Sequence, residues 1–89
     1  MQQYRYIFIG DVQGVGLRWT ARNIARNYEV TGYVRNLSDG TVECLIEGEL
    51  REAEAVVEEI LNRMDGFIRK TTCQTAPASG KFANFDVAY

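Results

Sequence analysis

The chain has 89 residues, of which 46% are hydrophobic and 25% charged, and its net charge is −2. This length and composition predict one ordinary globular domain over residues 1–89 and exclude a disordered or membrane-embedded chain. No apolar run is long enough to cross a bilayer or to act as a secretory signal, so we expect a cytoplasmic protein without membrane contacts.

The two cysteines, Cys44 and Cys73, are widely separated, and the chain has no histidine. Structural zinc sites use four closely spaced cysteine and histidine ligands, so no metal site is expected. The simplest interpretation is a pair of buried, reduced thiols on strands. A disulfide between them stays open as an alternative, because it requires strands that place the two residues side by side.

Charge is distributed unevenly along the chain. Residues 1–40 carry five arginines and three acidic residues, whereas residues 41–89 carry five basic and nine acidic residues. A nucleic acid-binding domain usually has a more basic surface, so no nucleic acid partner is expected. A small anion bound within the first half is compatible with this distribution.

The first expected element is a strand over residues 4–9, where aromatic and β-branched residues predominate. A loop rich in glycine follows over residues 11–17. From Arg18 onward, apolar residues recur at helical spacing, which predicts an amphipathic helix. Three aromatic side chains share one face of the strand and are expected in the core: Tyr4, Tyr6 and Phe8.

The helix that begins near Arg18 has one apolar stripe and one basic face. Its apolar positions are Ala21, Ile24, Ala25 and Tyr28. Arg22 and Arg26 follow Arg18 at steps of four residues, and we interpret them as a solvated face. Trp19 is interpreted as part of the core rather than as a wall of a site.

Two strands joined by a hairpin are predicted next. Residues 30–36 form the first, and residues 37–40 supply an Asp-Gly turn. Residues 41–47 alternate, with apolar side chains on one face and Glu43 and Glu47 on the other. This alternation is typical of a half-buried strand.

The remaining elements complete a known arrangement. Residues 49–64 form an acidic amphipathic helix, residues 67–75 a polar strand suited to a sheet edge, and residues 82–88 a short last strand. The order β-α-β-β-α-β plus a terminal strand predicts an α+β, ferredoxin-like sandwich, with two helices packed on one face of an antiparallel sheet. Because this fold hosts many functions, it does not determine the chemistry.

The loop from Gly10 to Arg18 is the segment most suggestive of chemistry, because it contains three glycines between a strand and a helix. Glycine permits left-handed backbone angles and a close approach to a ligand. The N–H groups of such a loop and of a helix N-terminus bind anions, and Arg18 adds a planar cation suited to phosphate oxygens. The pattern is neither a P-loop nor a dinucleotide fingerprint. The glycines alone would also fit an ordinary turn.

The whole string resembles the acylphosphatase signature G-x-V-Q-G-V-x-F-R at every fixed position except the Phe, where this chain has Leu17. A second motif of that family resembles residues 32–36 together with Gly40, Val42 and Gly48, and residues 80–85 resemble its closing G-x-F-x-x-F. The resemblance extends over roughly residues 5–88. Three motifs in this order within one short chain favour membership of the family.

The resemblance implies a metal-independent hydrolase without a cofactor, which converts a small-molecule acyl phosphate into a carboxylate and inorganic phosphate. A monomer is the default expectation. Arg18 would bind the phosphoryl group and Asn36 would position the attacking water. Because the leaving carboxylate has a pKa of about 4, no general acid is required. The backbone amides of six residues would cradle the phosphate oxygens: Gln13, Gly14, Val15, Gly16, Leu17 and Arg18.

The same residues also fit other interpretations. Asn36 could simply cap the following turn. An RNA-recognition module shares the element order, but residues 41–47 lack the aromatic side chains on which bases stack. A non-catalytic domain that binds or senses phosphate or carbamoyl phosphate is the second candidate. The acylphosphatase-like region of a hydrogenase-maturation protein, which acts on carbamoyl phosphate, shows that such a domain also serves within larger proteins. Leu17 is expected to loosen the loop packing, and Asp11 to weaken anion binding if it faces the loop.

Overall fold

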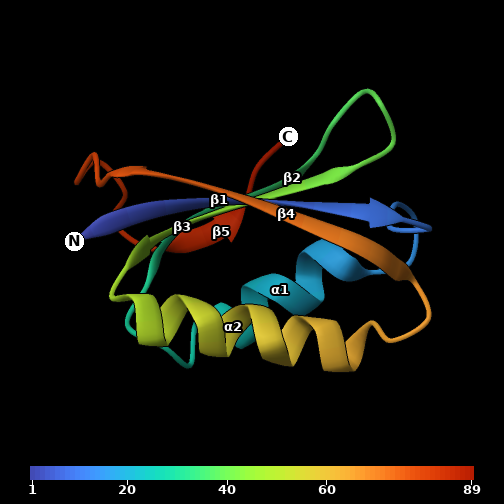
Figure 1. Cartoon of the computed structure of the whole chain (residues 1–89), viewed down its shortest axis with the longest axis horizontal. Helices are drawn as coiled ribbons and strands as arrows, with labels where there is room; N and C mark the ends of the chain where they lie inside the picture. The colour runs from blue at the N-terminus through green and yellow to red at the C-terminus, as the bar shows by residue number, and fades with distance from the viewer.

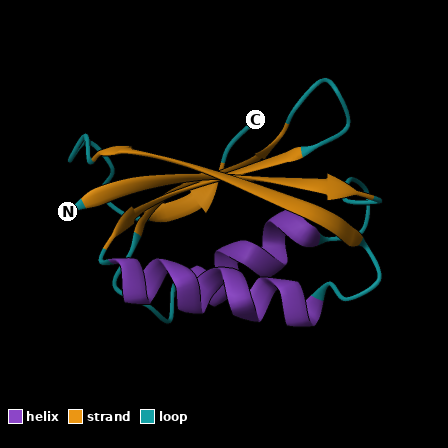
Figure 2. Cartoon of the chain, viewed as in Figure 1, coloured by secondary structure: helices purple, strands orange, loops and turns teal.

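The computed structural model describes all residues, 1–89. Two helices cover one face of a five-stranded sheet, and the other face of the sheet is left without a helix (Figures 1 and 2). Neither helix combines the length and the apolar composition that a membrane crossing requires. The elements in chain order are β1 (Gln2–Gly10), α1 (Leu17–Ala25), β2 (Thr31–Asn36), β3 (Val42–Gly48), α2 (Leu50–Arg63), β4 (Ile68–Pro77) and β5 (Phe85–Val87).

The sheet has the order β4-β1-β3-β2-β5. The pairs β4–β1, β1–β3 and β3–β2 are antiparallel, whereas β5 lies parallel to β2, so the sheet is mixed. The predicted ferredoxin-like order and the short terminal strand are confirmed. The polar strand β4 lies at one edge, as its composition indicated.

The core lies between the helices and the sheet. Alternate residues of β1 point toward the helices, and the buried aromatic residues Tyr4, Tyr6 and Phe8 meet the apolar stripes of α1 and α2 there. Ile24 of α1 and Ile60 of α2 are almost completely buried in the same cluster. The predicted core faces of β1 and the two helices are therefore confirmed, except that Tyr28 lies beyond the end of α1 and is only partly buried against the core.

Glu43 and Glu47 do not lie on a solvated face, so the prediction of a half-buried strand was wrong for β3. Their side chains are only 2% and 4% exposed. Strand β3 is flanked by β1 and β2, and neighbouring polar groups cover the face that carries no helix. The alternation of the sequence was correct, but it cannot reveal this cover, because long side chains and a later loop supply it.

Each glutamate has its own set of donors. Glu43 is ion-paired with Arg5 and with Arg35, the latter at 2.6 Å. Glu47 accepts hydrogen bonds from the Gln3 amide and from the backbone N–H groups of Ser79 and Gly80, at 2.8 to 3.0 Å. Burial by itself raises the pKa of Glu47, but these hydrogen bonds outweigh it and lower the pKa to about 2.

The cysteines differ from each other. Cys44 is buried and Cys73 is exposed, and both are free thiols. The prediction of two buried thiols was therefore wrong for Cys73, because β4 is an edge strand. Strand β1 lies between them, with Tyr6 opposite Cys44 on one side and opposite Cys73 on the other, so they are not neighbours in the sheet.

Candidate active site

The loop between β1 and α1 turns through two glycines with left-handed backbone angles. Gly14 has a φ of 78° and Gly16 a φ of 80°. No atom lies within 4 Å of the position where a Cβ would stand on either residue, so the backbone angle rather than space favours glycine here. Gly16 immediately precedes α1, so this turn leads directly into the helix N-terminus.

The N–H groups of this loop have few partners within the protein. The first helical bond runs from the N–H of Thr20 to the carbonyl of Gly16, at 3.0 Å. None of the backbone N–H groups of residues 12–19 donates a backbone–backbone hydrogen bond. A helix N-terminus also carries a partial positive charge. This segment therefore offers a row of unpaired donors, as an anion-binding loop requires.

A small pocket of about 170 Å³ lies at this loop. Its volume is below the range of about 300–1,000 Å³ that is common for larger organic ligands, and it suits a compact group. Arg18 comes from the first turn of α1 and Asn36 from the last residue of β2, so the fold brings together residues that are distant in the sequence. Seven residues line the pocket: Val12, Gly14, Gly16, Leu17, Arg18, Trp19 and Asn36.

Asn36 has an unpaired polar atom. Its Oδ1 is buried and has no hydrogen-bond partner in the protein, and it is the only buried side-chain nitrogen or oxygen in this condition. A buried acceptor without a partner is costly, so such an atom calls for an explanation. A ligand or water bound in the pocket would supply the missing donor.

Gln13 has a structural role that the sequence did not reveal. Its side-chain amide donates hydrogen bonds to the carbonyl oxygens of Leu37 and Thr41, at 2.8 and 3.0 Å. Both acceptors lie in the β2–β3 connection, directly after Asn36. The side chain thus fastens the loop to the hairpin that carries Asn36. Only the tertiary structure places a Gln amide between two loops that are far apart in sequence.

Arg18 is the arginine of α1 that forms no ion pair, whereas Arg22 and Arg26 bind opposite oxygens of Asp86, at 3.1 and 3.2 Å. Hydrogen bonds from the Val87 N–H and from Arg22 lower the pKa of Asp86, although its limited burial opposes this. The prediction that Arg22 and Arg26 form only a solvated face was therefore incomplete. The Arg18 guanidinium lies over the ring of Tyr89, 5.2 Å from its centroid, which leaves its charge unneutralised.

The two departures from the family signature lie in different surroundings. Leu17 is only 1% exposed and belongs to the core cluster, so its side chain anchors the loop to the hydrophobic core. Asp11 is exposed and forms an ion pair with Arg69 at 3.3 Å. This ion pair offsets part of the negative charge that Asp11 brings to the loop.

The predicted site residues fall into two groups. Gly14, Gly16, Leu17, Arg18 and Asn36 line the pocket, whereas Gln13 and Val15 belong to the same loop without lining it. Trp19 lines the pocket and is 51% exposed, so its interpretation as part of the core was wrong. No three His, Cys, Asp or Glu side chains gather where they could hold a metal ion.

Known proteins match this chain along its whole length. The family model for acylphosphatase matches residues 4–87. An acylphosphatase of Ligilactobacillus salivarius is 36% identical over 90 residues, covering 100% of both chains.

Solved structures agree with these sequence matches. The crystal structure of acylphosphatase from Bacillus subtilis is 31% identical, with a TM-score of 0.90 and full coverage of both chains. The chain also matches 12% of HypF from T. kodakarensis, with 28% identity and a TM-score of 0.85. The chain therefore belongs to the acylphosphatase family and is an enzyme of that hydrolase class.

Proposed function

We propose that this chain hydrolyses the carboxyl–phosphate bond of acyl phosphates without a metal ion, with Arg18 binding the phosphoryl group and Asn36 orienting the attacking water. The observation that carries this proposal is the unpaired, buried Oδ1 of Asn36, in a side chain that lines the same small pocket as Arg18. An acceptor without a partner, beside a cation and unpaired N–H groups, suits a phosphoryl group and a water molecule.

Binding uses three sources of positive potential. The free N–H groups of residues 12–19 and the N-terminus of α1 hold the phosphoryl oxygens. The guanidinium of Arg18 contributes a full charge in a planar, bidentate geometry. The side chain of Gln13 keeps the loop and the Asn36 hairpin together, so the cradle is formed before the substrate arrives.

The chemistry requires little beyond this positioning. Water held by Asn36 attacks phosphorus, the bond between phosphorus and the acyl oxygen breaks, and the bonding electrons leave with the carboxylate. Phosphoryl transfer depends mainly on alignment and on stabilisation of charge on the phosphoryl oxygens. Because a carboxylate is a weak base with a pKa of about 4, it leaves without a proton donor.

The test is the hydrolysis of benzoyl phosphate in EDTA by the wild-type protein and by Arg18→Ala. We expect turnover by the wild type and a loss of at least ~10³-fold in kcat/KM for the variant, as for other arginines that stabilise a phosphoryl group in transfer. Arg51→Ala is the matched control, because Arg51 is an exposed arginine outside the pocket. Circular dichroism checks that each variant is folded.

Two outcomes would contradict the proposal. Equal activity of wild type and Arg18→Ala would place the site elsewhere. Phosphate binding by the wild type without turnover of any acyl phosphate would favour the alternative, a domain that binds phosphate or carbamoyl phosphate without catalysis.

A further inference from the structure

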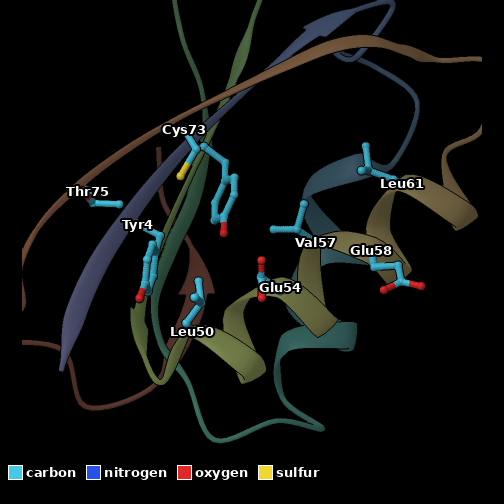
Figure 3. A pocket seen from close by; sticks show the side chains of 9 residues that line it. Tyr4, Leu50, Glu54, Val57, Glu58, Leu61, Cys73 and Thr75 are labelled. Carbon is cyan, nitrogen blue, oxygen red and sulfur yellow. The ribbon is translucent and has the colours of Figure 1, made fainter.

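A second pocket, of about 470 Å³, opens between helix α2 and strands β1 and β4 (Figure 3). It shares no lining residue with the small pocket at the loop between β1 and α1, and the proposed hydrolysis does not use it. Its volume lies within the range typical of sites for small organic molecules. The pocket therefore needs an explanation of its own.

The pocket exists because the edge strand β4 is not fully covered. Cys73 and Thr75 of β4 are exposed, and both have small side chains. Across from them, α2 presents Leu50, Val57 and Leu61 (Figure 3). Leu50 is 50% exposed and Leu61 is 37% exposed, so an apolar wall faces solvent. An apolar group placed here would bury part of this surface.

Two tyrosines of β1 contribute aromatic surface. The ring centroids of Tyr4 and Tyr6 are 6.5 Å apart, with 32° between the planes. Burial raises the pKa of the Tyr6 phenol, and nearby Cys73 and Glu54 add to this effect, so the ring stays neutral. Tyr4 and Tyr6 are only 6% and 7% exposed, so a small part of each ring reaches the pocket and adds weakly to the attraction of a cation.

The charged lining residues of the pocket are both acidic, Glu54 and Glu58. Neither carboxylate forms an ion pair within the protein. Glu54 lies between α2 and the strands, whereas the Glu58 carboxylate extends away from them (Figure 3). Glu54 is thus the carboxylate positioned to act as counter-ion to a bound group. Acyl phosphates and other anions are repelled by the same charges.

We propose that this pocket binds an organic ammonium ion with a compact apolar body. The ammonium group lies beside the Glu54 carboxylate and the two tyrosine rings, and the apolar body packs against Val57 and Leu61 of α2. The pocket discriminates by charge, because a neutral molecule of the same shape loses the attraction of the Glu54 carboxylate.

The test is a titration of the ¹⁵N-labelled protein with phenethylammonium, followed by amide chemical shifts. We expect saturable shifts confined to residues around the pocket, including Cys73 and Thr75, and affinity at least about fivefold higher than for the neutral 2-phenylethanol. Phenylacetate, with the opposite charge, is expected not to bind. The readout does not depend on hydrolysis, so it stands apart from the test of the phosphate site.

Matched variants separate charge from packing. Glu54→Gln keeps the shape and is expected to remove most of the preference for the ammonium ion over the alcohol. Asp65→Asn removes the same charge from an exposed position outside the pocket and should leave the preference unchanged. Leu61→Ala should weaken both ligands alike. Equal affinity for phenethylammonium and 2-phenylethanol in the wild type, shifts at other sites, or no saturable shifts would overturn the proposal.

Discussion

Replacing Asn36 by Ala separates catalysis from stability. The Oδ1 of Asn36 has no hydrogen-bond partner within the protein, so only a water in the pocket can satisfy it. Asn36→Ala breaks no bond to this oxygen within the protein, and it removes part of the cost of about 1–3 kcal/mol that a buried, unpaired acceptor carries. We therefore expect the free energy of unfolding to stay the same or to rise by about 1 kcal/mol, which corresponds to a rise of roughly 4–8 °C in Tm for a domain of this size.

The catalytic rate of Asn36→Ala should fall, although its stability stays the same or rises. If Asn36 orients the attacking water, its removal is expected to lower kcat by about 100-fold, as for the loss of one preorganised polar group in other hydrolases. Urea or thermal unfolding followed by circular dichroism gives the stability, and benzoyl phosphate hydrolysis gives the rate.

The control is Asn84→Ala, which truncates an exposed asparagine outside the pocket and should change neither quantity appreciably. An Asn36→Ala variant that is clearly destabilised and still nearly fully active would refute the reasoning. The side chain would then act as the cap of the turn that follows it rather than as a group that orients water.

Three further outcomes are expected. Gln13→Ala loses the two hydrogen bonds to the β2–β3 connection and should lower kcat/KM about 10-fold, and wild-type kinetics in this variant would contradict the bracing role. Gly16→Ala should lower the free energy of unfolding by about 1–2 kcal/mol and remove most of the activity. Gly66 has a similar φ of 89° and open space at its Cβ position, so Gly66→Ala should lower the stability by a similar amount and leave the activity unchanged. The pKa of Glu47 is lowered to about 2, so the stability that its carboxylate contributes is complete above its ordinary pKa of 4.5 and is lost as the pH falls toward 2. Glu47→Gln has no such carboxylate, so the free energy of unfolding of this variant should depend less on pH between 4.5 and 2 than that of the wild type.

Local patterns in the sequence were sufficient to predict the elements and the glycine turns of the loop. The alternation of residues 4–9 and the helical spacing from Arg18 onward depend on neighbours within one element, so they predict β1 and α1 without knowledge of the fold. The glycines near Arg18 are also a local signal, because left-handed turns and a helix N-terminus are formed by adjacent residues.

The partners of the long polar side chains could not be predicted in this way. Glu43 was expected on a solvated face, yet Arg5 and Arg35 from the two flanking strands bury it. Cys73 was expected to be buried, yet its strand forms the edge of the sheet. Both errors share one cause, because burial depends on which strand lies next to which.

The candidate site likewise has parts that the sequence predicted and parts that only the tertiary structure shows. The sequence by itself predicted the glycine-containing loop and Arg18, because residues 12–18 are contiguous, and it pointed to Asn36 only through the resemblance to a family motif. Only the tertiary structure places Asn36 and Arg18 in one pocket, ties Gln13 to the hairpin, and leaves Oδ1 of Asn36 without a partner within the protein. These three features depend on the order of strands in the sheet, and that order is set by packing between segments that no local pattern connects.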